Sequence, residues 1–203
     1  MLAVQYPGRQ DRLAEPCLVA MEQLADAIVT ALEPFLDLPL ALFGHSMGAS
    51  LAHEVALRLE RAGESPRLLM VSARLPPRHH APRIESWDDQ ALLADVRILD
   101  PDSDGVLADP DMRALLLPTI RADYLVADGY RPAPDPVVGA PVVAYAGDRD
   151  PYVSVWQLRA WSEITESGFE TVVFPGGHFY LRAHETELVQ DISSRLVTNV
   201  VPR

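Results

Sequence analysis

One five-residue segment constrains the fold more strongly than any other feature of the chain. Residues 44–48 read Gly-His-Ser-Met-Gly, which fits the pattern G-x-S-x-G. An apolar run at residues 40–43 precedes them, and residues 50–62 follow with helical spacing. This context is typical of a tight strand-to-helix turn that presents a serine above a sheet. The alternative is a helix start at which Ser46 serves only as a capping residue.

Strand-like and helix-like segments alternate along much of the sequence. The predicted strands are short apolar runs at residues 2–6, 40–43, 68–72, 141–146 and 169–174. The predicted helices cover residues 18–32, 50–62, 154–164 and 185–197. Such alternation is typical of a mostly parallel sheet flanked by crossover helices, so the pattern predicts an α/β fold.

Residues 75–135 interrupt this alternation. They contain no clear strand, and residues 87–99 and 112–127 have amphipathic helical spacing on either side of a polar loop at 100–111. Helices inserted between strands predict a lid over one end of the sheet. A chain of 203 residues has the size of one domain, so we predict a single α/β domain over residues 1–203 with the lid inserted.

The charge balance argues against two classes of partner. Lys and Arg number 17 against 29 Asp and Glu, which gives a formal net charge of −12. Such a protein repels phosphate backbones and anionic membrane surfaces, so we expect no nucleic-acid partner and no membrane partner. The sequence also contains no apolar run long enough for a membrane span, and we expect no signal peptide. The single cysteine, Cys17, fits a reducing cytoplasm, and we expect it to be structural.

Chain order selects the partners of Ser46. In α/β hydrolases the acid follows the serine along the chain, and the histidine follows the acid. Asp148 and Asp150 both lie just after the predicted strand at 141–146, and either could serve as the acid. Of the six histidines, His178 alone has the right order and lies in a loop after the last predicted strand. We therefore predict His178 as the base, and we exclude His45 because adjacent residues on such a turn point apart.

These residues suffice for serine-hydrolase chemistry. His178 would take the proton of the Ser46 hydroxyl as its oxygen attacks an acyl carbon, while the acid holds the imidazole in the correct tautomer. The Met47 amide, at the start of the following helix, would be one oxyanion donor. Water would then release the acid from an acyl-Ser46 intermediate. The sequence therefore predicts an enzyme that works as a serine hydrolase.

Five short blocks, spread over nearly the whole chain, occur together in one known family. They are YPGRQDR at residues 6–12 with Glu15 and Pro16, FGHSMGA at 43–49, LPTIRAD at 117–123, GDRDP at 147–151 and GGHFY at 176–180. In this combination they resemble the type II, or editing, thioesterases of polyketide and nonribosomal peptide synthesis. The first and last blocks are more specific than the serine motif, because generic lipases lack them in this combination.

The resemblance implies a fold, a substrate and an acid. Its fold is the α/β hydrolase, with lid helices at about residues 75–135. Its activity is hydrolysis of acyl thioesters from the phosphopantetheine arm of acyl or peptidyl carrier proteins, which removes stalled or aberrant acyl groups. The family needs no metal, and its substrate carries the phosphopantetheine, so the resemblance implies no cofactor of the protein's own. Its acid falls on the second Asp of the Gly-x-x-Asp stretch, here Asp150.

The sequence departs from the family at its start. Family members begin with a further strand and a glycine-rich loop of the type Phe-Pro-x-Ala-Gly-Gly, which supplies the second oxyanion amide. Residues 1–203 contain no such loop. Because the loss of one oxyanion donor costs about 100- to 1,000-fold in rate, we expect either a trimmed form of a longer protein or an impaired oxyanion hole.

Three alternative functions involve the same residues. The first is a small-molecule carboxylesterase with the same triad, which a preference for oxygen esters over thioesters would reveal. The second is a catalytically weak carrier-protein-binding pseudo-hydrolase, which the missing loop favours and which would bind carriers without turnover. In that case the candidate contacts to an acidic carrier would be Arg9, Arg12, Arg74 and Arg78. Acyl transfer to an acceptor other than water would use the same triad.

Overall fold

A parallel sheet and a group of helices make up this computed structural model, which describes residues 1–79, 88–132 and 136–199. The chain divides into two units. The helical unit comprises Met1–Leu24 and Ala81–Arg131, and the sheet unit comprises Ala25–His80 and Pro132–Arg203.

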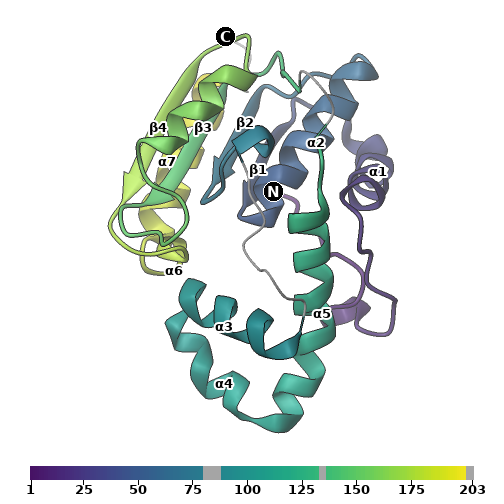
Figure 1. Ribbon diagram of the computed structural model, residues 1–203. Coiled ribbons are helices and arrows are strands. Elements are labelled where there is room, and N and C mark those ends of the chain that lie inside the picture. Colours follow the sequence, from purple (N-terminus) through teal and green to yellow (C-terminus); the bar gives the residue numbers. More distant parts are fainter. Residues whose placement is uncertain (80–87, 133–135, 200–203) are drawn as a thin grey trace. The chain divides into compact units, whose positions relative to one another are not determined.

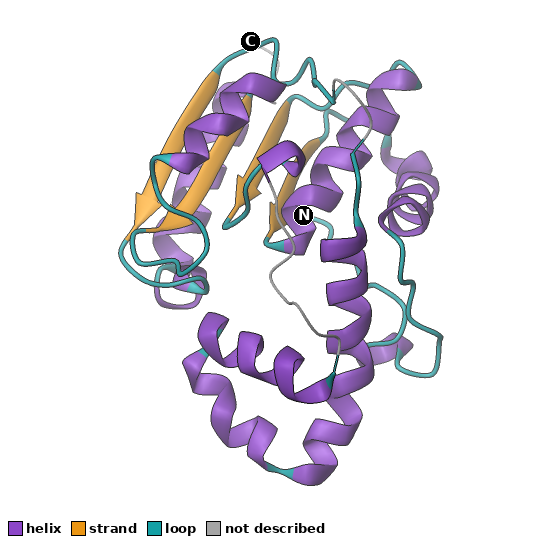
Figure 2. Ribbon diagram, in the orientation of Figure 1, coloured by secondary structure: helices purple, strands orange, loops and turns teal. Residues whose placement is uncertain are grey.

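Four parallel strands form the sheet, side by side in the order β1-β2-β3-β4 (Figure 2). They are β1 Ala41–His45, β2 Leu68–Ser72, β3 Val142–Gly147 and β4 Phe169–Phe174. Every residue of β2 and β3 is buried, as expected for parallel strands covered on both faces. Four of the five predicted strands are therefore confirmed.

Successive residues of the central strands point to opposite faces of the sheet, and each face has its own core. On one face, Leu69 and Val71 pack with α2 (Met47–Arg61) and with the 3₁₀ helix η5 (Gln157–Ile164). On the other face, Leu68 and Met70 pack with Leu188 of α7 (Glu185–Asn199; Figure 1). The central strands are thus apolar throughout because both of their faces are covered.

The remaining elements of the sheet unit are short, apart from α1, which runs across the boundary between the units. They are α1 Met21–Leu32, η2 Glu33–Phe35, η3 Pro77–His79 and α6 Tyr180–Ala183. The sequence predicted α1 three residues too early, and it did not predict α6. It also predicted an α-helix at residues 154–164, whereas the structure has the 3₁₀ helix η5 from Gln157.

The helical unit contains the two helices predicted for the lid. Its elements are η1 Gln10–Arg12, α3 Asp89–Leu99, η4 Pro101–Ser103, α4 Asp104–Ala108 and α5 Pro110–Gly129. Asp88 caps α3 by accepting the Ala91 amide, and Asp109 caps α5 in the same way. The predicted polar loop at 100–111 is wrong in detail, since η4 and α4 lie within it. That these helices act as a lid stays a prediction.

The predicted strand at residues 2–6 is wrong, because these residues have no regular secondary structure. A short apolar run becomes a strand only where a partner strand supplies its hydrogen bonds. Here the Gln5 carbonyl instead accepts a hydrogen bond from Arg12 Nη1 (2.8 Å), and the Gly8 amide donates to the Arg12 carbonyl (3.0 Å). The Gln5 carbonyl is therefore used in a local contact rather than in strand pairing.

The first sequence block joins helix α5 within the helical unit. The Arg9 guanidinium binds the Asp123 carboxylate through two hydrogen bonds of 2.8 and 3.1 Å. The Thr119 hydroxyl donates to the Gly8 carbonyl at 3.1 Å. Gly8 has a φ of +82°, and a Cβ there would lie 2.2 Å from the Cys17 sulfur. The blocks at residues 6–12 and 117–123 thus contact one another, and Cys17 packs directly against Gly8.

Candidate active site

Ser46 lies on a strained turn between β1 and α2. Its φ of 54° and ψ of −122° are unusual for a residue that is not glycine. A Cβ on Gly44 would lie only 1.9 Å from the Gly48 carbonyl oxygen, so the first glycine of the motif is required for this close approach. The Ser46 hydroxyl makes no capping hydrogen bond to α2, which argues against the capping interpretation. Strain of this kind is typical of functional sites.

Main-chain contacts fix this turn at the C-terminal edge of the sheet. The Ser46 amide donates to the carbonyl of Ser72, at the end of β2, over 2.8 Å. Helix α2 begins at Met47, and its first amides have no partner within the helix. Together with the helix dipole, they favour negative charge beside Ser46.

Asp150 and His178 form a buried pair. His178 Nδ1 lies 2.8 Å from Asp150 Oδ2, and both side chains are almost completely buried, with 1% and 0% of their surface exposed. The other oxygen, Oδ1, accepts the amides of Tyr152 (2.9 Å) and Val153 (3.1 Å). Because an acceptor faces Nδ1, the proton of a neutral His178 belongs there, which leaves Nε2 as the basic nitrogen.

Asp148, the other candidate acid, lies elsewhere. Its Oδ1 accepts the Gly176 amide at 2.7 Å, and the residue is exposed. The Arg149 amide donates to the Gly176 carbonyl at 2.8 Å, and a Cβ on Gly147 would lie 2.4 Å from that same oxygen. Asp148 therefore braces the loop that leads to His178, while Asp150 contacts the imidazole itself.

His45 lies beside His178, a contact that sequence reasoning missed. Their ring centroids are 5.0 Å apart, and His45 Nδ1 lies 2.9 Å from the hydroxyl of Ser72. Burial, followed by the charge of His178, lowers the pKa of His45 to about 3. His45 therefore stays neutral when His178 takes up a proton, and the two rings do not become adjacent cations.

The structure joins Asp150 directly to His178 and places His178 against the residue that precedes Ser46. Among the described residues, no hydrogen bond links the Ser46 hydroxyl to His178. Catalytic hydrogen bonds are often long in the absence of substrate and tighten when it binds. Ser72 and Tyr180 also belong to this neighbourhood; Tyr180 falls within the GGHFY block, whereas Ser72 lies at a strand end with no motif around it.

Three further histidines among the described residues are engaged elsewhere. His53 is fully buried in α2, with Nε2 2.8 Å from the Pro136 carbonyl. His79 pairs with Glu163 at 3.0 Å, and His184 lies 3.9 Å from Glu187. None of these contacts involves the Asp150–His178 pair.

The arginines suggested as carrier contacts have mostly structural partners. Arg74 is only 3% exposed and donates from Nε to the Ser50 hydroxyl at 3.3 Å, so its assignment as a surface contact is wrong. Arg9 pairs with Asp123, and Arg12 pairs with Glu15 at 2.6 Å. Arg78 is exposed.

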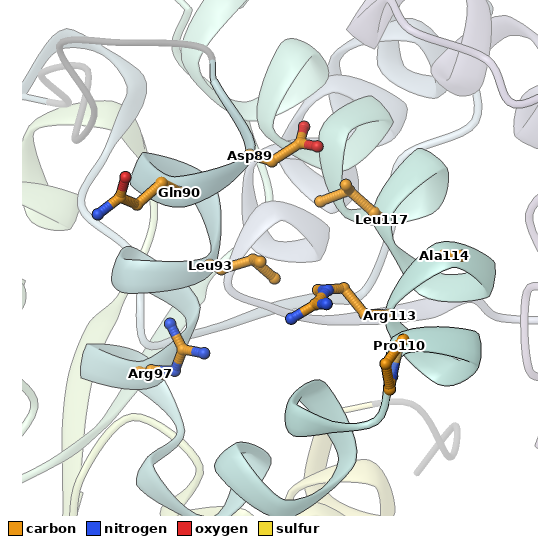
Figure 3. Close-up of a pocket in the computed structure, with 8 residues that line it drawn as sticks. All are labelled: Asp89, Gln90, Leu93, Arg97, Pro110, Arg113, Ala114 and Leu117. Atoms are coloured by element: carbon orange, nitrogen blue, oxygen red, sulfur yellow. The ribbon is translucent and has the colours of Figure 1, made fainter.

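A separate pocket of about 540 Å³ lies within the helical unit, between α3 and α5 (Figure 3). Its lining includes the polar residues Asp89, Gln90, Arg97 and Arg113. Arg97 is already paired with Asp104 at 2.6 Å, and Asp89 with Arg121. None of the predicted catalytic residues lines this pocket.

No cluster of three or more His, Cys, Asp or Glu side chains suited to a metal ion occurs in residues 1–79, 88–132 and 136–199. Over the same part of the chain, none of the helices combines the length and the apolar composition needed to cross a membrane.

Comparison with known proteins assigns the chain to a family. The family model described as "Thioesterase domain" matches residues 1–196. Thioesterase PikA5 of Streptomyces venezuelae is 43% identical over 199 residues, which are 97% of this chain and 71% of that protein. A probable cadicidin biosynthesis thioesterase of Streptomyces griseus is 38% identical over 195 residues, 94% of this chain but only 54% of that protein.

The fold is shared with solved structures as well. The structure of BorB, a type II thioesterase from the borrelidin biosynthetic cluster, matches with a TM-score of 0.84 at 43% identity. The match covers 96% of this chain and 80% of BorB. The chain therefore belongs to the thioesterase family, as an enzyme of the hydrolase class. Its predicted α/β-hydrolase fold class and its resemblance to type II thioesterases are confirmed.

Proposed function

We propose that this chain hydrolyses acyl thioesters carried on the phosphopantetheine arm of acyl or peptidyl carrier proteins, through an acyl-Ser46 intermediate. The observation that carries the proposal is the buried hydrogen bond between Asp150 and His178, whose ring packs beside the strained turn that bears Ser46. A serine on such a turn, with an oriented imidazole nearby, is suited to nucleophilic acyl transfer.

The proposed reaction has two halves. As the Ser46 oxygen attacks the thioester carbon, Nε2 of His178 takes the hydroxyl proton, and Asp150 stabilises the imidazolium that forms. The Met47 amide donates to the developing oxyanion. Collapse of the tetrahedral intermediate breaks the carbon–sulfur bond, and His178 protonates the departing thiolate. Water then attacks the acyl-serine with the same base, which releases the carboxylic acid and restores Ser46.

The proposed partners follow from the relatives and from the charge. BorB is a type II thioesterase of a biosynthetic cluster, and such a context supports an editing role in which stalled or aberrant acyl groups are removed. The proposed substrate brings its own phosphopantetheine, so the proposal includes no further cofactor or metal. The net charge of −12 disfavours a nucleic-acid partner, and the proposed location is the cytoplasm.

The proposal also assigns a role to the helices of residues 75–135, which would form a lid that selects acyl chains. Substitutions of exposed apolar residues there, such as Met112 and Leu115, should alter the acyl-chain profile and leave the reaction of Ser46 with a small fluorophosphonate unchanged. An unchanged profile would remove the lid from the proposal.

The decisive experiment is release of free acid from an acyl-loaded carrier protein, followed by intact mass, with Ser46→Ala as the matched variant. Wild type should unload the carrier, and the variant should fold but leave it loaded. Release that persists in Ser46→Ala would exclude Ser46 as the nucleophile. Faster cleavage of matched oxygen esters would favour the carboxylesterase, and carrier binding without release would favour the pseudo-hydrolase.

A further inference from the structure

Ser72, at the end of β2, lies where three parts of the candidate site meet. Its carbonyl accepts the Ser46 amide over 2.8 Å. Its hydroxyl lies 2.9 Å from His45 Nδ1 and 2.7 Å from the Tyr180 hydroxyl. The Ser72 side chain is fully buried. One residue therefore contacts the nucleophile turn through its backbone and two aromatic side chains through its hydroxyl.

Tyr180 links Ser72 to the loop that contains His178, the predicted base. It begins α6, two residues after His178, and is 2% exposed. Its ring stacks on Phe174, the last residue of β4, with centroids 5.2 Å apart and planes inclined by 11°. Burial raises the pKa of Tyr180 to about 12, so its phenol stays protonated and able to donate. Stacking and the hydrogen bond together fix the start of α6.

His45 links Ser72 to His178 by a second route. Its ring packs against those of His178 and Phe179, with centroid distances of 5.0 and 5.5 Å. His45 also directly precedes Ser46 in the chain. A continuous series of contacts thus runs from Ser46 through His45, Ser72 and Tyr180 to the loop that holds His178.

The residue after Ser72 has an unusual backbone conformation, which indicates that this strand end is constrained. Ala73 has a φ of 52°, a conformation that residues other than glycine rarely adopt, and its amide donates to the Tyr145 carbonyl at 2.8 Å. Such a conformation persists only where its surroundings enforce it, and it is typical of functional sites. Ser46 and Ala73 are strained at the ends of neighbouring parallel strands, the edge where α/β sheets place their sites.

We propose that Ser72 is a positioning residue, which acts through His45 and Tyr180 to hold His178 in register with Ser46. This inference rests on the proposed function. A hydroxyl suits the position because it can accept one hydrogen bond and donate another, which alanine cannot do. Displacement of catalytic groups by about 1 Å can cost about 100-fold in rate, so loss of this link should slow the chemical step.

The test uses Ser72→Ala, Tyr180→Phe and the double variant. Two readouts are compared: kcat and KM for acid release from an acyl-carrier protein, and the rate at which Ser46 reacts with a fluorophosphonate. Each single variant should lower kcat and the labelling rate about 10- to 100-fold, with KM changed less than about threefold. The double variant should be no slower than Ser72→Ala, because both changes break one connection. Ser72→Thr, which keeps the hydroxyl, should recover most of the activity.

Tyr145→Phe is the matched control. It also removes a phenol hydroxyl with a 2.7 Å hydrogen bond, in this case to Asp191 on α7. It should lower thermal stability and leave kcat and the labelling rate unchanged.

The outcomes separate this inference from the proposed function. If wild type neither labels nor releases acid, the proposed function fails, and the inference fails with it. If wild type is active and folded Ser72→Ala and Tyr180→Phe both react at the wild-type rate, the inference alone is overturned. Should Ser72→Ala not fold, Tyr180→Phe decides the question by itself, because it keeps the ring that stacks on Phe174.

Discussion

At the scale of single residues, two aspartates only two positions apart have different surroundings. Asp150 is buried and accepts from His178, while exposed Asp148 accepts the Gly176 amide. A carboxylate that orients an imidazole cannot be replaced by an amide, because the amide favours the wrong tautomer.

Asp150→Asn should therefore lower kcat by about 1,000- to 10,000-fold. Asp148→Asn should lower it less than about tenfold, since it removes only a brace of the loop. Steady-state release of acid from a loaded carrier measures both, with circular dichroism to verify folding. The reverse order of effects would transfer the acid role to Asp148.

His45 should make the protein sensitive to acid. Burial is the largest cause of the low pKa of His45. The charges of His178, Asp150 and Arg182 act on the same ring. Because the folded pKa of about 3 lies below the unfolded value of about 6.5, the unfolded state binds more protons between these values. The contribution of neutral His45 to stability is therefore fully present above about pH 6.5 and is lost as the pH falls toward 3.

The free energy of unfolding should fall by at most about 1.4 kcal/mol per pH unit from His45 below pH 6.5. Buried His53, whose pKa is also lowered, adds to the slope. Urea unfolding at pH 7, 6 and 5 measures the slope in wild type and in His45→Asn, which has no group that titrates in this range. Equal slopes in the two proteins would show that His45 is not buried in its neutral form.

At the scale of elements, the turn from β1 to α2 depends on backbone contact rather than on side-chain packing. A Cβ at Gly44 would meet the Gly48 carbonyl oxygen at 1.9 Å and the Ala49 amide at 2.8 Å. Neither is the end of a flexible side chain, so the strand and the helix would have to separate.

Gly44→Ala should destabilise the protein by about 3 kcal/mol or more. The control is Gly105→Ala in α4, where a Cβ meets nothing within 4 Å. The control should be neutral or stabilise by up to about 1 kcal/mol, because alanine favours a helix. Urea unfolding compares the two, and wild-type stability in Gly44→Ala would contradict the geometry of the turn.

At the scale of the whole molecule, the helical unit is assembled from two distant parts of the chain. Arg9 and Asp123 join them through two parallel hydrogen bonds. Burial raises the pKa of the Asp123 carboxyl, so removal of the guanidinium would leave a poorly solvated charge.

Arg9→Gln should therefore lower the free energy of unfolding by about 1 to 2 kcal/mol, a value reduced to allow for the partial exposure of both side chains. Hydrogen exchange should accelerate at residues 6–12 and in α5 and stay unchanged in β2 and β3. The control is Arg97→Gln in the same unit, whose partner Asp104 is exposed. Equal protection of α5 in Arg9→Gln and wild type would show that the pair does not hold the unit together.

The parts of the fold that depend on neighbouring residues could be predicted from the sequence. Apolar runs predicted four strands, and the glycines of the serine motif predicted the turn. These features follow from local backbone sterics and from burial of both faces of a parallel sheet. The run at residues 2–6 carried the same local signal, but no strand partner exists for it in the described residues.

Contacts between residues far apart in the sequence depend on the tertiary structure. Asp150 and His178 are 28 residues apart, Ser72 and Tyr180 are 108 apart, and Arg9 and Asp123 are 114 apart. The residues left both Asp148 and Asp150 open as the acid, the family resemblance favoured Asp150, and no sequence pattern pointed to Ser72. The physical reason is that periodicity and turn chemistry act over a few residues, whereas a buried hydrogen bond depends on how strand ends and loops are brought together by the packed sheet.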